Sequence, residues 1–429
     1  MAAKPRRNKR SALVRELRLF AAHWLALSLV AVASLSAGVG GAWWFLTSTG
    51  RIAHHASGPD PLRAAPGAFA WSQLPVAEFP IPPYAKFLRD IVIVIDPGHV
   101  GQKDRGANFK RSKNGLREAE VNLRVSRYLR EFLEAAGAKA ILTRDEDREL
   151  GLEDSEDFRA RAEVATNARA SLFISVHHNA ADAETANYTT VFYHNGADTS
   201  PASQAAGRYV LNGLNDALRL ENHIACALLS DLVQYPGPHK PGFAVLRLSR
   251  VPAVLIESSF YTNEIEERRL RDPLYNRREA YGVFLGLARW AQAGLPSVEL
   301  NDPADGRVRA GQTVMIGLDD GLSRRGGWGA DLNRIREDSI VVKFEGARLA
   351  HEFDAAKRQL AVTIPRNAAV GQAELLIDFV TIFGQPVQKP MIPLIVTDGT
   401  ANPTARSRQP SNTPRKPATP AKPKPRTQN

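Results

Sequence analysis

The chain has 429 residues, of which 44% are hydrophobic and 24% charged, the balance of a folded protein, so wholesale disorder is excluded. Its formal net charge is +11, but residues 1–18 carry +6 and residues 400–429 carry +7, so the part between them is close to neutral. A basic nucleic-acid-binding domain is therefore not expected, and the single cysteine, Cys226, excludes an intramolecular disulfide and a zinc site built from cysteines.

The N-terminus is typical of an exported protein. Residues 1–18 form a basic tail, and residues 19–46 are apolar with one ionisable side chain, His23. As a helix rising about 1.5 Å per residue, this stretch would be ~42 Å long, more than the ~30 Å hydrocarbon core of a bilayer. Basic residues before it predict a cytoplasmic N-terminus and an extracytoplasmic chain, on the periplasmic or cell-wall side. The length of the stretch favours an uncleaved inner-membrane anchor, and a cleaved signal peptide is the alternative.

The next residues predict a linker followed by an α/β domain. Residues 47–89 are rich in Pro, Ala and Gly and are typical of a tether. Residues 90–296 alternate short apolar runs with helical patterns, which predicts a twisted, mostly parallel sheet flanked by helices. The expected strands are 91–95, 138–144, 171–178, 189–194, 243–248 and 252–258, and the expected helices are 121–137, 156–169, 201–219 and 275–294.

The C-terminal part has a different pattern. Residues 297–398 contain six short apolar runs joined by Gly-, Asp- and Asn-rich turns, and helical periodicity is largely absent. This pattern predicts a small all-β, sandwich-like domain. Residues 399–429 contain seven prolines, seven basic residues and no aromatic residue, so they are expected to form a disordered tail.

Polar residues follow three of the predicted strands. The run 91–95 leads to His99, the run 171–178 ends in His177 and His178, and Glu257 ends the last strand of the domain. Active sites of open α/β sheets form beyond the carboxyl ends of the strands. We therefore expect these side chains to meet at one edge of the sheet.

A further carboxylate is expected from the first helix of the domain. Glu118 precedes Val121 and Val125 by three and seven residues, so it shares their buried face. Glu120 shares a face with Arg124, which is typical of a solvent-exposed position. Helical periodicity therefore favours Glu118 over Glu120 as the carboxylate that points inward.

Two imidazoles with two carboxylates are the groups of a catalytic zinc site. Zinc binds His nitrogen and carboxylate oxygen, and a hydrolytic site keeps one position for water. A nearby free carboxylate can then move the proton of that water. The alternative for each residue is a hydrogen-bonded structural role at a strand end. A strand covered on both faces does not show which of His177 and His178 points to the site.

Four segments resemble a known family. IVIDPGHVGQKDRGA, GLREAEVNL, FISVHHNA and PAVLIESSFYTN resemble, in order and spacing, the zinc-dependent N-acetylmuramoyl-L-alanine amidases of bacterial cell-wall turnover, the Amidase_3 family. The resemblance covers residues 90–296 and implies an α/β domain with a twisted sheet. It also implies that His99, Glu118 and His177 bind Zn²⁺ and that Glu257 is the catalytic carboxylate. The implied reaction is hydrolysis of the amide between the lactyl group of N-acetylmuramic acid and L-alanine of the stem peptide of peptidoglycan.

The sequence departs from the family at several positions. Val100 replaces the usual glycine after the first metal histidine, Ser258-Ser259 replace the usual pair after the catalytic glutamate, and His178 replaces a small residue. His178 could therefore contact substrate or compete as a metal ligand. Residues 220–242 match the family poorly, so it stays open whether they form the inhibitory helix that some members carry.

Other functions and partners stay open. The chain could be a non-catalytic peptidoglycan-binding or scaffold protein, although the presence of all four chemical residues argues against this alternative. It could also be a zinc hydrolase of another amide. The domain at 297–398 could bind peptidoglycan or a partner, or act as a spacer, and a regulatory protein is a further candidate partner. Asn179 and Arg247 line the cleft in one interpretation, and are a turn residue and a surface charge in the other.

Overall fold

The computed structural model describes the α/β and all-β parts of the chain, namely residues 79–100, 110–151, 153–195, 200–237, 239, 241–325 and 332–398. The predicted basic tail, the apolar stretch, most of the linker and the C-terminal tail lie outside the described residues. Within these described ranges, no helix combines the length and the apolar character needed to span a bilayer.

The first domain is built on a six-stranded sheet. Its strands are β1 (Val92–Pro97), β2 (Lys139–Leu142), β3 (Leu172–Asn179), β4 (Thr190–Tyr193), β5 (Ala227–Ser230) and β6 (Ala253–Phe260). They lie in the order β2-β1-β3-β6-β4-β5, and each neighbouring pair is parallel except β4 with β6. The predicted mostly parallel sheet is therefore confirmed.

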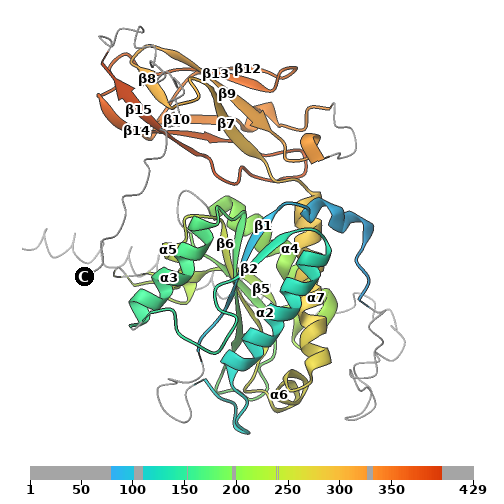
Figure 1. Ribbon diagram of the computed structural model, residues 1–429. Helices are drawn as coiled ribbons and strands as arrows, with labels where there is room; N and C mark the ends of the chain where they lie inside the picture. Colours follow the sequence, from blue (N-terminus) through green and yellow to red (C-terminus); the bar gives the residue numbers. More distant parts are fainter. Residues whose placement is uncertain are drawn as a thin grey trace, which may run out of the picture. The chain divides into compact units, whose positions relative to one another are not determined.

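Helices cover both faces of this sheet. They are α2 (Glu118–Ala135), α3 (Asp154–Asn167), α4 (Ser200–Leu218), α5 (Ala244–Leu248), α6 (Glu264–Leu270) and α7 (Pro273–Gln292), with the 3₁₀ turns η4 (Pro83–Leu88), η5 (His223–Ala225) and η6 (Asp231–Val233). As Figure 1 shows, α2, α4 and α7 cover one face, and α3 and α5 cover the other. The helix α7 begins two residues before its predicted start, at Pro273, where Asp272 accepts a hydrogen bond from the Leu274 amide and Pro273 opens the first turn.

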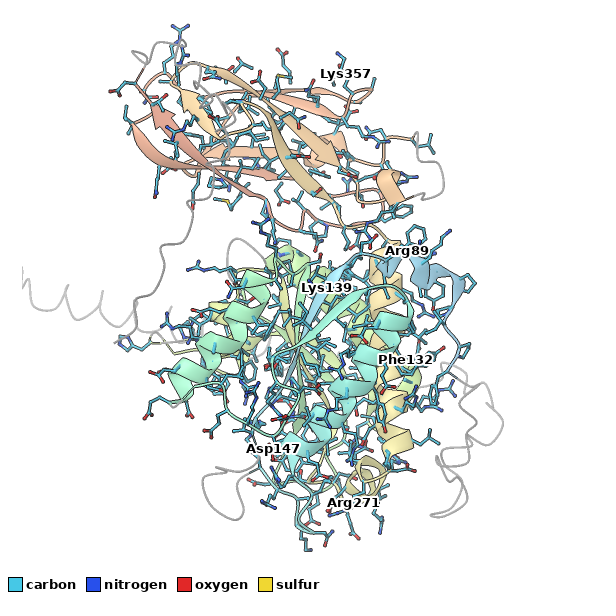
Figure 2. The ribbon with its side chains drawn as sticks, viewed as in Figure 1. Arg89, Phe132, Lys139, Asp147, Arg271 and Lys357 are labelled. Carbon is cyan, nitrogen blue, oxygen red and sulfur yellow. The ribbon has the colours of Figure 1, made fainter. Side chains whose placement is uncertain are left out.

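The two faces of the sheet bury different side chains of the same strands. On the side of α3 and α5, Val94, Phe173 and Leu255 join one apolar cluster with residues of those helices. On the other side, Phe132 of α2 stacks on Phe284 of α7 with ring centroids 5.5 Å apart, and Figure 2 shows Phe132 on the side of α2 that faces α7. Successive strand residues point to opposite faces of the sheet. Two neighbouring residues at a strand end can therefore place their side chains on different faces.

Three parts of this domain differ from the predictions. The run 243–248, predicted as a strand, contains the helix α5 from Ala244 to Leu248, because a short apolar run has no periodicity that separates a helix from a strand. The strand β5 and the helix α6 were not predicted, since the first is only half-buried and the second is dominated by charged residues. At the end of the predicted linker, Ala85 and Leu88 are fully buried in η4, so this part of 47–89 is packed.

The second domain consists of two sheets that share one apolar core. Its elements are β7 (Ser297–Asp302), β8 (Arg307–Arg309), β9 (Thr313–Asp319), η7 (Ser323–Arg325), η8 (Glu337–Ser339), β10 (Val341–Phe344), β11 (Ala347–Arg348), β12 (His351–Asp354), β13 (Gln359–Thr363), β14 (Gly371–Asp378) and β15 (Met391–Thr397). One sheet has the order β11-β10-β14-β15-β8, and the other has β12-β13-β9-β7. Ile316 from the second sheet and Leu375 from the first belong to the same buried cluster. The sandwich-like prediction is confirmed, and the short strands β8, β11 and β12 were missed.

The close contact of α4 and α7 depends on glycines. A Cβ atom on Gly286 would lie 2.4 Å from the carbonyl oxygen of Tyr209, and one on Gly213 would lie 2.2 Å from the carbonyl oxygen of Gly282. Alanine normally stabilises a helix interior by about 1 kcal/mol relative to glycine. Here the added methyl group must push the helices apart, so we expect Gly286→Ala to lower the free energy of unfolding by about 1–3 kcal/mol.

Urea denaturation of the full-length chain measures this effect. Gly237→Ala is the matched control, because Gly237 is exposed and an added Cβ meets no atom within 4 Å. The control should change the free energy of unfolding by less than about 0.5 kcal/mol. An unchanged stability of Gly286→Ala would contradict the close packing of the two helices.

Candidate metal centre

The sheet brings the predicted site residues to one edge. The strands β1, β3 and β6 are parallel neighbours, so their carboxyl ends lie together. The register pairs Pro97 with Val176, and His177 lies directly beside Glu257. His99 follows the end of β1 by two residues. These three side chains therefore approach the same point from three strands, as the sequence predicted.

Glu118 completes a cluster of three metal-binding side chains. Its Oε2 lies 3.1 Å from His99 Nε2, and its Oε1 lies 3.1 Å from His177 Nδ1. The two imidazole rings meet edge to face with centroids 4.7 Å apart. One ligand atom from each residue lies within 4.8 Å of the others, and within the part of the chain that the structure describes no other group of His, Cys, Asp and Glu has this geometry. The cluster could hold a metal ion.

The protonation states of the cluster suit a cation. Burial works to raise the pKa of Glu118, but the two neighbouring imidazoles outweigh it and hold this pKa well below its usual range. Burial lowers the pKa of His177, Glu118 opposes this shift and His99 adds to it, and the pKa is lowered overall, so the ring favours its neutral, metal-binding form. Glu118 is 1% exposed, and its Oε2 has no hydrogen-bond partner although His99 is near. A buried carboxylate oxygen without a partner is costly, and a metal ion would satisfy it.

The turn that carries His99 has a restricted backbone. His99 itself adopts the left-handed conformation with φ of 56°, which is uncommon outside glycine. At Gly98, an added Cβ would lie 2.2 Å from the Cε1 atom of His177. The glycine therefore lets the ring of one predicted ligand pack against the backbone that carries the other.

Two buried arginines hold this turn from behind. Arg144 donates hydrogen bonds to the carbonyl oxygens of Pro97 and Gly98, both at 2.9 Å. Arg161 donates to the Pro97 carbonyl at 2.9 Å and to the buried carboxylate of Asp96 at 2.8 Å. Burial works to raise the pKa of Asp96, but Arg161 and two hydroxyl donors outweigh it, so this carboxyl is charged and paired. The ligand-bearing turn is thus fixed by charge-assisted hydrogen bonds.

Glu257 differs from Glu118 in its surroundings. Its Oε2 is buried without a hydrogen-bond partner, and the residue lines a cleft of about 560 Å³ together with His99 and His177. Burial raises the pKa of Glu257 well above its usual value, the charge of Glu118 raises it further, and Lys110 opposes this shift only weakly. A carboxyl with a raised pKa in a cleft beside potential metal ligands is typical of a proton-transfer group.

The choice between the two glutamates of α2 follows the prediction. Glu118 is buried at the start of the helix. Glu120 has a side chain that is 57% exposed, and its carboxylate lies 3.9 Å from Arg124 one turn further along the helix. Helical periodicity therefore placed both side chains correctly.

His178 lies outside the cluster of three metal-binding side chains. Although His178 borders the cleft, its side chain is 0% exposed and points to the opposite face of β3 from His177. Its Nδ1 lies 2.8 Å from Asn122 Oδ1, and its Nε2 lies 3.1 Å from Glu279 Oε2. In this position its two ring nitrogens face Asn122 and Glu279 and are not part of the cluster of His99, Glu118 and His177. The sequence interpretation missed Asn122 and Glu279, although Asn122 lies four residues after Glu118 on the same helical face.

The segment 220–242 forms one wall of the cleft. Its described residues contain η5, β5 and η6, and none of them lies in an α-helix, so the open expectation of an inhibitory helix is not met there. Tyr235 lines the cleft and packs edge to face on Phe243, with centroids 5.2 Å apart. Arg247 donates to the carbonyl oxygen of Pro241, which holds the end of this segment. Asn179 lines the cleft, as one of its two interpretations predicted.

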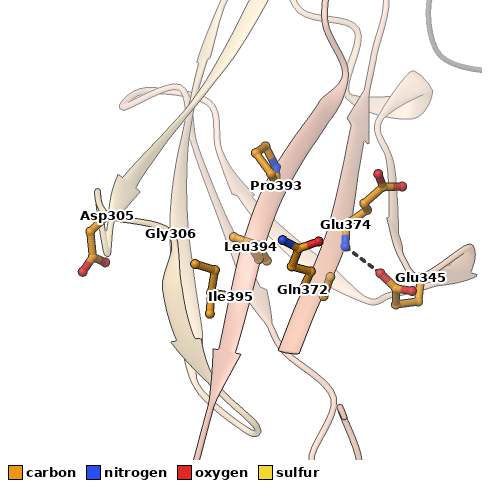
Figure 3. A pocket seen from close by; sticks show the side chains of 9 residues that line it. Asp305, Gly306, Glu345, Gln372, Glu374, Pro393, Leu394 and Ile395 are labelled. Carbon is orange, nitrogen blue, oxygen red and sulfur yellow. Dashed lines mark hydrogen bonds between the residues drawn. The ribbon is translucent and has the colours of Figure 1, made fainter. Parts of the chain in front are cut away.

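The all-β domain has a hollow of its own, which Figure 3 shows. Gln372 and Glu374 of β14 line it beside Pro393 and Ile395 of β15. The Glu374 amide donates to the Glu345 carboxylate at 2.6 Å. The residues that line this hollow include no histidine or cysteine, so the hollow lacks the mixed donor set found in the first domain.

Known proteins share this domain. The sequence model of the Amidase_3 family, described as N-acetylmuramoyl-L-alanine amidase, matches residues 93–289. The N-acetylmuramoyl-L-alanine amidase LytC of Bacillus subtilis (strain 168) is 33% identical over 195 residues, which are 45% of this chain and 34% of LytC. The N-acetylmuramoyl-L-alanine amidase AmiA of Escherichia coli (strain K12) is 31% identical over 228 residues, 46% of this chain and 74% of AmiA.

A solved structure gives a similar match. The N-acetylmuramoyl-L-alanine amidase AmiC2 of Nostoc punctiforme is 27% identical. The match has a TM-score of 0.39 and covers 47% of this chain and 97% of that chain. The chain spans less than two thirds of the length of the first curated relatives it matches, from 34% to 59%.

The α/β fold with a His-Glu-His cluster at the strand ends defines a hydrolase-type domain that could hold a metal ion. The chain belongs to the Amidase_3 family, the N-acetylmuramoyl-L-alanine amidases.

Gly98 offers a test of the cluster that leaves its donor atoms in place. A methyl group at this position would lie against the His177 ring and displace it. We expect Gly98→Ala to lower the affinity of the full-length chain for Co²⁺ by at least tenfold, the lower end of the effect of changing residues that orient metal ligands. Competition with a chelator measures the affinity, and Gly237→Ala is the matched control. Wild-type affinity in Gly98→Ala would show that the ring position does not matter for metal binding.

The raised pKa of Glu257 predicts how the stability of the metal-free protein depends on pH. Because the folded state favours the protonated carboxyl, the stability that this group contributes is complete below its ordinary pKa and is lost as the pH rises. Glu257→Gln removes this loss, so the variant should gain stability over wild type between pH 5 and pH 8, by at most about 1.4 kcal/mol per pH unit.

Thermal unfolding with excess chelator at both pH values measures this difference. Glu120→Gln, which alters an exposed carboxylate of α2, is the matched control. A stability difference between Glu257→Gln and wild type that is the same at pH 5 and pH 8 would contradict the raised pKa.

Proposed function

We propose that this chain is a zinc-dependent N-acetylmuramoyl-L-alanine amidase. It would hydrolyse the amide between the lactyl group of N-acetylmuramic acid and L-alanine of the stem peptide in peptidoglycan. The observation that carries this proposal is the cluster of His99, Glu118 and His177 beside the unpartnered carboxyl of Glu257 in an open cleft. Family membership and the names of the relatives LytC and AmiA support the choice of substrate.

The donor set favours zinc as the metal. Two imidazole nitrogens and one carboxylate oxygen are a set that catalytic zinc sites use, with a further position left for water. His99, Glu118 and His177 would hold the ion. When bound, zinc lowers the pKa of a water molecule and polarises a carbonyl group under attack.

Glu257 is the proposed proton-transfer residue. The parallel pairing of β3 with β6 places it beside His177, and its Oε2 has no other partner. Beside a bound cation the carboxylate form is favoured, so the group can accept a proton from water. The burial that raises its pKa then helps it to return this proton to the leaving amine of L-alanine.

We infer that the reaction takes place outside the cytoplasm, where peptidoglycan lies. The basic residues 1–18 followed by the apolar stretch 19–46 support export, with this stretch as an inner-membrane anchor or a cleaved signal. Wall remodelling or separation of daughter cells is the corresponding cellular role.

Incubation of the full-length chain with purified peptidoglycan tests the proposal, with released fragments identified by mass spectrometry. We expect free stem peptides that begin at L-alanine, and their loss when a chelator removes the metal. Glu257→Gln should lower the rate by at least about 10²-fold, since general acid–base catalysis contributes ~10²–10⁴-fold, while the zinc content stays at the wild-type level. Glu120→Gln is the matched control and should retain the rate.

The metal content separates the roles of the residues. His177→Ala should lose both zinc and activity, because it removes one of three ligands. Full zinc occupancy in His177→Ala would overturn the ligand assignment, and loss of zinc in Glu257→Gln would make Glu257 a ligand. Release of fragments cut at another amide would overturn the substrate, and zinc binding without any cleavage would favour a binding or scaffold role.

A further inference from the structure

A row of buried polar side chains lies directly behind the metal cluster. Glu279 of α7 contacts His178 of β3, His178 contacts Asn122 of α2, and Asn122 contacts Glu118. The side chains of Glu279 and His178 are both 0% exposed, and Asn122 is fully buried as well. The row therefore joins α7 to a predicted metal ligand across the face of the sheet that is remote from the cleft.

The neighbours of Asn122 fix the orientation of its amide group. Its Nδ2 lies 3.2 Å from the carbonyl oxygen of Gly98 and 3.4 Å from Glu118 Oε1, and both of these atoms accept hydrogen bonds. The reversed amide would set an oxygen against two acceptors. Asn122 therefore donates to both the turn that carries His99 and the carboxylate of Glu118.

The same reasoning fixes the role of His178. Since the Asn122 nitrogen faces Gly98 and Glu118, its Oδ1 faces His178 Nδ1 at 2.8 Å and must receive a proton from it. On the other side of the ring, Nε2 contacts Glu279 at 3.1 Å, which prevents the imidazole from turning over. His178 thus acts as the donor that holds the Asn122 amide in place.

The carboxylate of Glu118, at the start of α2, receives several contacts. Arg117, the residue before α2, makes no capping hydrogen bond with its side chain. The Oε1 atom of Glu118 is instead approached by His177 Nδ1 at 3.1 Å, by the His178 amide at 3.2 Å and by Asn122 at 3.4 Å. These contacts orient the carboxylate so that Oε2, which has no hydrogen-bond partner, is the oxygen available to a cation.

We propose that His178, held by Glu279, is a positioning residue for the metal ligand Glu118 and acts by donating its Nδ1 proton to Asn122. This inference rests on the proposed function, because it assigns Glu118 to the metal. It assigns a role to His178, at a position where the family resemblance implies a small residue.

A matched pair of substitutions tests the donor. Asparagine and leucine have the same branched shape, but only asparagine can place an N–H near the position of His178 Nδ1. Both variants, His178→Asn and His178→Leu, are made in the Glu279→Gln background, so that neither leaves an unpaired buried carboxylate. The full-length proteins are compared for Co²⁺ and Zn²⁺ affinity by chelator competition and for the visible absorption spectrum of bound Co²⁺.

The two variants should differ in their metal sites. We expect His178→Leu to lose about 10–100-fold in metal affinity, the range found for outer partners of metal ligands, and to shift the Co²⁺ spectrum. His178→Asn should retain most of the affinity and the spectrum of the Glu279→Gln parent. Equal losses of metal affinity in both variants would show a general packing effect and overturn the proposal. An unchanged metal affinity in His178→Leu would also overturn it.

A measurement on the unmodified protein covers the case in which the variants do not fold. In protein labelled with ¹⁵N-histidine, NMR should show a proton on Nδ1 of His178 that exchanges slowly with water. An Nδ1 without a proton would overturn the proposal. A wild-type chain that binds neither Zn²⁺ nor Co²⁺ would instead contradict the proposed function, so the two failures can be told apart.

Discussion

The candidate site depends on one buried carboxylate, that of Glu118, between two imidazoles. Removing a charged carboxylate from water costs several kcal/mol unless other groups compensate. Here His99 and His177 lie 3.1 Å away on either side, and the amide of His178 approaches the same group. This arrangement needs two parallel strands that end together and a helix that begins at that edge. The order β1-β3-β6 supplies the edge, and the first turn of α2 supplies the carboxylate.

The site combines well-paired and unpaired buried groups. Asp96 is paired with Arg161. Arg144 and Arg161 both donate hydrogen bonds to carbonyl groups of the turn that carries His99, and His99 itself takes a left-handed conformation. In contrast, one oxygen of Glu118 and one of Glu257 accept no hydrogen bond. Buried polar groups without partners are rare in folded proteins and often mark functional sites. The paired groups therefore stabilise a frame in which the unpaired ones stay available for a cation and a proton.

Much of the fold and site could be predicted because burial leaves a periodic pattern. The strands near 91–95 and 252–258, and the inward position of Glu118, follow from apolar runs and helical spacing. The helix α5 could not be predicted, because a run of five residues, four of them apolar, is too short to show a distinguishing period. The orientation of His178 could not be predicted either, since β3 is buried on both faces and its sequence does not show which face is which. Glu279 comes from a distant helix, and no local pattern connects it to Glu118.

The alternation along β3 gives two neighbouring histidines opposite surroundings. His177 points toward the cleft and Glu257, whereas His178 points toward α2 and α7, where Asn122 and Glu279 surround it. The strand thereby connects the polar layer behind the sheet to the ligand cluster in front of it, through two side chains that are one residue apart. A small residue at position 178 would leave Glu279 and the Asn122 amide oxygen buried without this ring between them, which is unfavourable for both. The histidine and the glutamate of α7 are thus physically dependent on each other, and a chain that carries one at this position needs a partner of matching hydrogen-bond character on the facing helix.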